Sequence, residues 1–321
     1  MTMRTLITGG TGFVGSNLVR RLLRDGHQVH LLVRPGFNPW RIEEVRRDLR
    51  LHVAPLCDAD AVSRVVATAR SDWVFHLAAH GAYSWQTGAA EIVGTNYLGT
   101  MALVEACLKQ GVAAVVNTGS SSEYGFKDHA PAEDELPDPN SHYAAAKAAA
   151  TLYCGFAART HNVRIPTLRL CSAYGLYEEP ARLLPTLILH GLRGELPPLA
   201  NPDIARDYIS VDDICDAYLL AATAPLADPG AVYNVGTGIQ TDLRQVVKIA
   251  REVFDIAAEP NWGSMPARLW DTTVWVANSR KLQTELGWRP RVCFKDGLRR
   301  MADWFRAHPD WCGYYTRRLA A

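Results

Sequence analysis

The sequence has no apolar run that approaches the roughly 20 residues of a membrane-spanning helix. It runs from Met1 directly into a strand-like segment, with no signal-peptide pattern before it. It also lacks a charge bias, because the formal net charge is +1 and the longest charged cluster, residues 41–50, alternates in sign. Such a balance disfavours binding to nucleic acids or membrane surfaces. We therefore expect a cytoplasmic protein with neither partner.

Paired cysteines are also missing. The chain has seven cysteines, an odd number, and none forms a C-x-x-C pair. This pattern predicts buried thiols rather than disulfides or zinc ligands. His76, His80 and His142 have no mutual metal-ligand spacing, so we expect no metal site.

What the sequence does contain is enough apolar material for a large core, 48% of 321 residues. Short apolar runs alternate with amphipathic stretches through the first half of the chain. We predict strands at 5–7, 28–33, 51–53, 73–77, 112–117 and 163–170, and helices at 12–24, 59–69, 91–109 and 141–159. This alternation predicts an α/β fold with a doubly wound parallel sheet, helices on both faces and right-handed crossovers.

The pattern loosens after residue 171, where prolines become frequent, as in a segment that caps a cleft. Further elements are predicted at 205–211 and 233–235 (strands) and at 213–222, 241–254, 279–286 and 295–306 (helices). We predict a dinucleotide-binding domain over residues 1–170, to which 205–232 returns. Residues 171–204 and 233–321 are predicted to form a smaller C-terminal α/β substrate-binding region.

A glycine-rich turn, T-G-G-T-G-F-V-G at 8–15, joins the first strand to the first helix. Gly9 permits a tight turn, Gly12 lets a pyrophosphate approach the backbone, and Gly15 lets helix and strand pack closely. Phe13 and Val14 open the helix, whose free N–H groups and dipole favour an anion. The turn predicts a Rossmann-type cofactor site; the alternative is a tight turn without a ligand.

Tyr143 and Lys147 carry the strongest chemical signal. Four residues apart, they share one face of the predicted helix. A phenol has a pKa of about 10, and a neighbouring ammonium is expected to lower it. Tyr143 would then exchange a proton with a hydroxyl or carbonyl group while hydride moves to or from nicotinamide. Lys147 would also hold the nicotinamide ribose.

Three more segments, F-H-L-A-A at 75–79, T-N-Y-L-G-T at 95–100 and R-D-Y-I-S-V-D-D at 206–213, accompany these motifs. Together they resemble the extended short-chain dehydrogenases of the NAD-dependent epimerase/dehydratase family, which modify nucleotide-activated sugars. The resemblance spans nearly the whole chain. It implies Ser120 as the third catalytic residue, or Ser121 if the register shifts by one. It also implies cofactor contacts from a further set of residues: Leu56, Leu77, Ala78, Ala79, Asn96 and Thr118.

The second strand ends at Arg34, where NAD-selective folds usually have an acidic residue that binds the ribose hydroxyl. A cation there would bind a 2′-phosphate, so we favour NADP(H), with NAD(H) possible if Arg34 is an ordinary solvated arginine. The family often has an aspartate near Pro55 that contacts adenine. Its absence here leaves the Leu56 backbone as the substitute.

The resemblance also bears on the reaction. In the related 4,6-dehydratases a carboxylate stands two residues before the tyrosine that matches Tyr124, where this chain has Ser122. Glu123 lies one place later, and a one-residue slip can turn a side chain away, which disfavours elimination. We therefore favour NADPH-dependent reduction of the 4-keto group of a nucleotide deoxysugar. The alternatives are an NAD-dependent nucleotide-sugar 4-epimerase and, from another class, a catalytically silent dinucleotide-sensing regulator.

On the substrate side, the resemblance implies contacts from Ser121, Ser172, Arg206 and Arg268. The two arginines would bind the diphosphate, or else be ordinary surface residues. Ser172 stands where the family commonly has asparagine. Trp270, Trp275 and Trp288 could stack on a base, although packing is their more common role. The resemblance further implies a homodimer through the helices at about 91–109 and 141–160.

Overall fold

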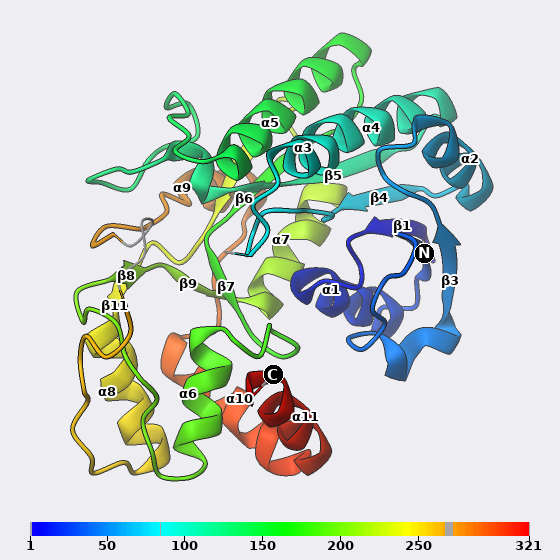
Figure 1. The fold of residues 1–321 in the computed structure, drawn as a ribbon. Coiled ribbons are helices and arrows are strands. Elements are labelled where there is room, and N and C mark those ends of the chain that lie inside the picture. The colour runs from blue at the N-terminus through cyan, green and yellow to red at the C-terminus, as the bar shows by residue number, and fades with distance from the viewer. Residues whose placement is uncertain (1, 84, 267–271, 321) are drawn as a thin grey trace.

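The computed structural model describes residues 2–83, 85–266 and 272–320 (Figure 1). Its main element is a parallel sheet in the order β10-β6-β5-β4-β1-β2-β3. The order reverses between β1 and β4, so the carboxyl ends of these strands open a crevice where α/β proteins bind ligands. The seven strands are β1 Arg4–Thr8, β2 Gln28–Val33, β3 Leu49–Val53, β4 Trp73–His76, β5 Ala114–Ser120, β6 Thr167–Leu170 and β10 Val232–Val235.

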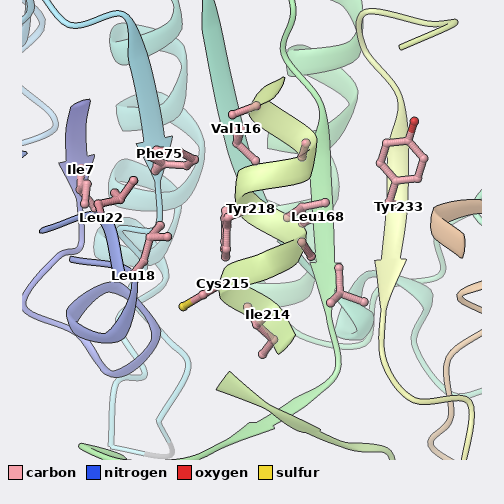
Figure 2. Close-up of a cluster of buried hydrophobic side chains, with 14 of the residues drawn as sticks. Ile7, Leu18, Leu22, Phe75, Val116, Leu168, Ile214, Cys215, Tyr218 and Tyr233 are labelled. Carbon is pink, nitrogen blue, oxygen red and sulfur yellow. The ribbon is translucent and has the colours of Figure 1, made fainter. Parts of the chain in front are cut away.

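Neighbouring residues of each central strand point to opposite faces and enter two different apolar clusters. Leu6, Val74 and Val115 face α2 (Ala59–Ala69), α4 (Gly99–Gln110) and α5 (His142–His161). Ile7, Phe75 and Val116 face α1 (Phe13–Arg24) and α7 (Val211–Thr223). Figure 2 shows α7 lying across this second face, with Tyr218 against the sheet. The predicted doubly wound fold is therefore confirmed.

A third apolar cluster belongs to the second half of the chain. It unites α6 (Leu183–Gly191), α8 (Leu243–Phe254), α10 (Phe294–Ala307) and α11 (Pro309–Ala320), which lie together below the sheet in Figure 1. Two small sheets connect this region to the large one. They pair β7 (Ser172–Tyr174) with β9 (Tyr208–Ser210), and β8 (Ala205–Arg206) with β11 (Thr241–Asp242). The domain boundaries predicted from the sequence stay a prediction. β10 pairs with β6 in the large sheet, and the adjoining helix α9 (Arg280–Leu286) packs in the apolar cluster on one face of that sheet.

Several elements differ from those predicted. The single helix expected at 91–109 is α3 (Ala89–Val93), a π-helical turn η2 (Gly94–Leu98) and α4. β5 continues to Ser120, and a 3₁₀ turn η3 (Ser121–Tyr124) follows it. The helix expected from Thr241 begins at Leu243, because Asp242 is its cap and accepts a hydrogen bond from the Gln245 N–H at 2.7 Å.

Helices α6 and α11 were not predicted from the sequence. Helix α11 packs on the segment that follows β2, where the Trp311 indole donates to Glu44 of the short 3₁₀ helix η1 (Glu43–Asp48) at 3.0 Å. The Trp311 ring also packs edge to face on Tyr177. The C-terminal helix therefore ties the outer edge of the large sheet to the second half of the chain.

All seven cysteines are free, but the prediction that they are buried is wrong for three of them. Cys57 and Cys293 are exposed and Cys312 is partly so. In the parts of the chain that the structure describes, no helix is both long and apolar enough to cross a membrane.

Candidate active site

The turn between β1 and α1 has no room for side chains at two of its glycines. Gly9 has φ +70°, and a Cβ there would lie 2.5 Å from the backbone nitrogen of Ala78. A Cβ on Gly15 would overlap the carbonyl oxygen of Gly9. At Gly12 the only near atom is this same carbonyl oxygen, at 3.1 Å. The turn is therefore open to a ligand at Gly12, whereas at Gly9 and Gly15 it is packed against neighbouring backbone.

Helix α1 starts at this open side without a side-chain cap. Gly12 is the N-cap residue, and no side chain accepts from the N–H groups of the first turn, which begins at Phe13 and Val14. Uncapped N–H groups at a helix N-terminus suit a phosphate. Leu77, Ala78 and Ala79 follow β4 beside the turn, with the Ala78 N–H donating to Thr8 Oγ1 at 3.2 Å. The chain therefore provides a cradle that fits a dinucleotide pyrophosphate.

A buried histidine links the strands on either side of the crevice. His76 Nδ1 lies 2.6 Å from the Thr8 hydroxyl, and its Nε2 lies 2.8 Å from the Thr100 hydroxyl. Burial, and to a lesser degree the Lys147 charge, lowers the pKa of His76 to about 3. His76 is therefore a neutral structural residue that holds β1, β4 and α4 together. Among the described residues, no three histidine, cysteine or acidic side chains gather to hold a metal ion.

The pKa of His76 predicts a pH dependence of stability. An unfolded histidine has a pKa of about 6.5, so between that pH and about 3 the unfolded chain binds one proton more than the folded chain. This group alone should remove about 1.4 kcal/mol of unfolding free energy per pH unit as the pH falls through that window. Thermal unfolding of His76→Gln should show a shallower dependence on pH than the wild type between pH 6.5 and 4.5. Exposed His161→Gln is the control, and parallel slopes for all three proteins would refute the assignment.

Ser120, Tyr143 and Lys147 meet at the carboxyl ends of the strands. Tyr143 and Lys147 lie on α5, which begins under the Ser141 cap. The Ser120 side chain lies close enough to the Tyr143 phenol to oppose the rise of its pKa. Lys147 Nζ donates to the Thr118 carbonyl at 2.8 Å, and its side chain is buried. Ser120, rather than Ser121, is thus the serine that contacts the tyrosine.

The electrostatics of this group differ from the prediction. Burial raises the pKa of Tyr143 to about 12, with Glu123 and Tyr83 acting in the same direction and the Ser120 hydrogen bond opposing it. Burial also lowers the pKa of Lys147 to about 8, against the attraction of Glu123. The expectation that Lys147 lowers the phenol pKa is therefore wrong for the protein without ligand. Burial is the largest cause for both groups, because removal from water disfavours the charged form of each.

Glu123 is completely buried and turned into the protein. Its Oε2 lies 2.8 Å from Arg169 Nε, and its Oε1 accepts from the Ser120 N–H at 2.8 Å and the Thr151 hydroxyl at 3.1 Å. Arg169 is itself only 3% exposed. Both carboxylate oxygens are therefore occupied by internal donors, so Glu123 anchors the turn after β5. The suggestion that the one-residue slip turns this side chain away agrees with the geometry.

Four other residues were predicted to bind the cofactor, and each lies in a different environment. Arg34 is exposed at the end of β2. Leu56 packs on Gly99, where an added Cβ would lie 2.7 Å from Leu56 Cγ. Asn96 is fully buried and uses its amide on the His80 backbone, at 2.7 and 2.9 Å. Thr118 hydrogen-bonds the Tyr218 hydroxyl at 2.6 Å. Asn96 therefore holds the loop after β4, a role that the motif alone did not reveal.

The predicted substrate residues fall on the other side of the crevice. Ser121 accepts a hydrogen bond from the Trp275 indole at 3.1 Å, and the Arg206 guanidinium lies over the same indole, 5.5 Å from its centre. Ser172 lies in β7 beside Asp207 and donates its N–H to that residue's carbonyl at 3.0 Å. Trp288 is buried and donates to the Asp213 carbonyl at 2.9 Å, so it packs rather than stacks on a ligand. Arg268 and Trp270 lie outside the described residues.

A small pocket opens next to Ser121 and Trp275. Its wall continues along the loop after β5, which contributes Lys127 and His129. Both halves of the chain line the pocket, since Asn234 and Ala277 face it together with Ser121.

Sequence reasoning missed two structural carboxylates within the R-D-Y segment. Asp207 is fully buried and accepts from the N–H groups of Thr237, Gly238 and Ala277. Asp213 accepts from the N–H groups of Arg291 and Val292. Both acids therefore attach the later chain to the edge of the crevice. Their role was hidden because every partner lies at least 30 residues away in the sequence.

Comparison with known proteins agrees with this geometry. The model of the family described as "NAD dependent epimerase/dehydratase family" matches residues 5–236. A dTDP-glucose 4,6-dehydratase of Streptomyces niveus is 32% identical over 96% of this chain and 94% of its own length. A UDP-glucose 4-epimerase of Mycolicibacterium smegmatis is 30% identical over 95% of this chain and 99% of its own length.

Among solved structures, a dTDP-glucose 4,6-dehydratase of Streptomyces venezuelae with bound NAD superposes with a TM-score of 0.83. It is 28% identical, and the match covers 96% of this chain and 98% of that one. That relative binds NAD, so the comparisons give no support to a preference for NADP. The two curated relatives named above are a dehydratase and a 4-epimerase, and neither name describes the 4-keto reduction favoured from the sequence.

Proposed function

We propose, from the premise that this chain belongs to the NAD-dependent epimerase/dehydratase family, that it is a nucleotide-sugar 4-epimerase with a bound nicotinamide dinucleotide. The observation that carries the proposal is the Ser120–Tyr143–Lys147 group beside the glycine turn, in a site where Glu123 is turned away. The arrangement suits hydroxyl oxidation and its reversal. The carboxylate in the turn after β5, Glu123, is held by Arg169 and by the donors of Ser120 and Thr151, which disfavours a role in elimination of water.

The residues of the chain would divide the work as follows. Tyr143 would take the proton of the sugar C4 hydroxyl and return it later, while the Ser120 hydroxyl holds the same oxygen. Lys147 would stabilise the phenolate, and its Nζ can remain anchored on the Thr118 carbonyl. The bound dinucleotide would supply reversible hydride transfer at C4. The C4 hydride would leave one face of the sugar for the dinucleotide, the 4-keto sugar would rotate in the site, and return of the hydride to the opposite face would invert C4.

The cofactor site fits the residues that are present. The uncapped N-terminus of α1 and the open side of Gly12 suit a pyrophosphate. Lys147 and the loop after β4 then stand where the nicotinamide end would reach. Arg206 and Ser121 would contact the nucleotide sugar from the other half of the chain, and Arg268 is proposed with them from the sequence alone.

A second candidate, the NADPH-dependent 4-ketoreductase, is favoured by one observation. Arg34 is exposed at the end of β2, and no acidic residue stands beside it in the sequence. A guanidinium there could bind a 2′-phosphate. The catalytic group would be the same, but each turnover would consume one reduced cofactor.

The nature of the bound cofactor separates the two candidates. Dinucleotide extracted from the purified protein should be NAD(H), tightly held, and its affinity should be the same in Arg34→Ala as in the wild type. The matched control is Arg47→Ala, another exposed arginine. Weak, exchangeable NADP(H), with the preference lost in Arg34→Ala and kept in Arg47→Ala, would instead favour the reductase.

We also propose a homodimer through the face formed by α3, η2 and α5. This face exposes large apolar side chains: Leu98 is 51% exposed, Leu152 67% and Phe156 60%. Such a contiguous apolar surface is typical of a subunit interface. Lys147 of the same α5 is buried and donates to the Thr118 carbonyl, so the catalytic group lies away from this face.

Phe156→Glu should convert the dimer to a monomer, because it would bury a charge in each of two symmetry-related positions. Light scattering after size exclusion should give half the wild-type mass. Leu136→Glu, which replaces an 84% exposed leucine outside this face, should leave the mass unchanged. A wild-type protein that is already monomeric would contradict the proposal.

A further inference from the structure

The small pocket beside Ser121 has basic side chains on its wall and no acidic ones. Among the described residues that line it, Lys127 and His129 are basic, and none is an aspartate or a glutamate. The other polar side chains on the wall include Tyr124 and Asn234, whose hydroxyl and amide oxygen are already hydrogen-bonded to each other at 2.8 Å. The lining therefore favours an anion over a cation as the occupant.

The acidic residues of the same loop are bound to His129. Its Nδ1 lies 2.8 Å from Asp128 Oδ1, and its Nε2 lies 3.0 Å from Glu135 Oε2. Glu135 Oε1 also accepts from the Ala132 N–H at 2.8 Å. Asp128 is 99% exposed, so water screens its charge. His129 thus closes the loop on itself and adds no net positive charge to the pocket.

Lys127 is the cation that the loop leaves available. Its side chain is 24% exposed, and within residues 2–83, 85–266 and 272–320 its one ionic contact is Glu135 Oε2 at 4.0 Å. This distance is too long for a hydrogen bond. Since Glu135 is already bound to His129 and to the Ala132 N–H, the three hydrogens of the Lys127 ammonium can be donated to a ligand.

Ser121 supplies a second donor on the same wall. Its Oγ accepts from the Trp275 indole at 3.1 Å, and an indole can only donate, so the Ser121 hydrogen points elsewhere and can be donated to an anion. Ser121 directly follows Ser120, which we propose holds the C4 oxygen of the sugar. A group that enters the pocket should therefore be attached to a carbon next to C4. In a hexose the exocyclic C6, on the adjoining C5, is such a group.

We propose that the pocket binds the carboxylate of a nucleotide-linked hexuronic acid, with Lys127 and Ser121 as its donors. Lys127 is then a specificity-determining residue. An ammonium–carboxylate hydrogen bond is roughly twice as strong as one between neutral groups, so a C6 carboxylate would gain more here than the hydroxymethyl group of a neutral hexose. This inference rests on the proposed function, because it takes a nucleotide sugar as the substrate and names its class.

The test measures binding and turnover of UDP-glucuronate and UDP-glucose, with the dTDP-linked pair in parallel. Calorimetric titration of the wild type should give an affinity about tenfold higher for the uronate, and kcat/KM should follow the same order. Lys127→Gln should lower the affinity for the uronate about tenfold more than that for the neutral sugar, mainly through KM in the kinetic assay. Its melting temperature should stay unchanged, because Lys127 makes no short ionic contact within the described chain.

Two further variants isolate the charge at this position. Lys127→Arg keeps the cation and should keep most of the preference. Lys109→Gln, which removes an exposed lysine at the end of α4, should keep all of it.

A wild type that binds the neutral sugar more tightly, or a Lys127→Gln protein with the wild-type ratio of affinities, would overturn this inference. Turnover of UDP-glucose in either case would leave the proposed function standing. Conversely, tighter binding of the uronate that depends on Lys127, in a protein that converts none of the four sugars, would support the carboxylate pocket and overturn the proposed epimerase activity.

Discussion

Replacing Tyr143 by phenylalanine should lower kcat by about a thousandfold, because it removes the group that we propose exchanges the C4 hydroxyl proton. The substitution deletes one hydroxyl whose partner is Ser120, so the fold should survive. Affinity for the dinucleotide should change little, since the pyrophosphate cradle lies on α1. Steady-state kinetics and cofactor titration of the same preparation measure both quantities.

Tyr314→Phe is the matched control for this prediction. It also removes a phenolic hydroxyl, but from α11, in the apolar cluster of the second half. Its kcat should equal that of the wild type. A Tyr143→Phe enzyme that keeps more than about a tenth of the wild-type kcat would show that another group carries the proton, since general acid–base catalysis contributes at least a hundredfold.

Replacing Glu123 by alanine should lower the free energy of unfolding by about 3–5 kcal/mol, because it leaves the Arg169 guanidinium buried without its ionic partner. The Ser120 N–H and the Thr151 hydroxyl would lose their acceptor as well. For a chain of this size such a loss corresponds to a melting temperature lower by roughly 5–15 °C. Chemical denaturation and calorimetry would measure it.

The surface pair of Arg251 and Glu259 supplies the control, since Glu259 is 82% exposed and its replacement by alanine should change stability by at most about 1 kcal/mol. A second variant, Glu123→Gln combined with Arg169→Met, removes both charges and should recover much of the loss. If Glu123→Gln instead kept full stability and abolished turnover, Glu123 would be an acid–base residue, and elimination would return as a candidate reaction.

Local patterns predicted the parts of this protein that depend on local physics. The alternation of apolar runs predicted the sheet and both helical layers, because burial on two faces imposes that pattern on each strand. The glycine turn and the Tyr143–Lys147 spacing are short motifs, and the structure brings them to the same crevice. Ser120 was implied by the family resemblance, with Ser121 as the alternative, and the effect of its side chain on Tyr143 agrees with Ser120.

Features that depend on distant partners were not predictable from the sequence. The pairing of Glu123 with Arg169 joins residues 46 apart, and the hydrogen bond from Trp311 to Glu44 joins residues 267 apart. The sign of the Tyr143 pKa shift was wrong because the degree of burial cannot be read from a spacing of four residues. The π-helical turn that presents Asn96 to the His80 backbone looks, in sequence, like ordinary helix.

The most direct test of the proposed function is to follow UDP-glucose and dTDP-glucose by proton nuclear magnetic resonance while the total reduced cofactor is monitored by ultraviolet absorbance. The account predicts that the C4 epimer accumulates to equilibrium with no net change in cofactor. A 4-keto-6-deoxy product, or no turnover by a protein that retains its dinucleotide, would contradict it.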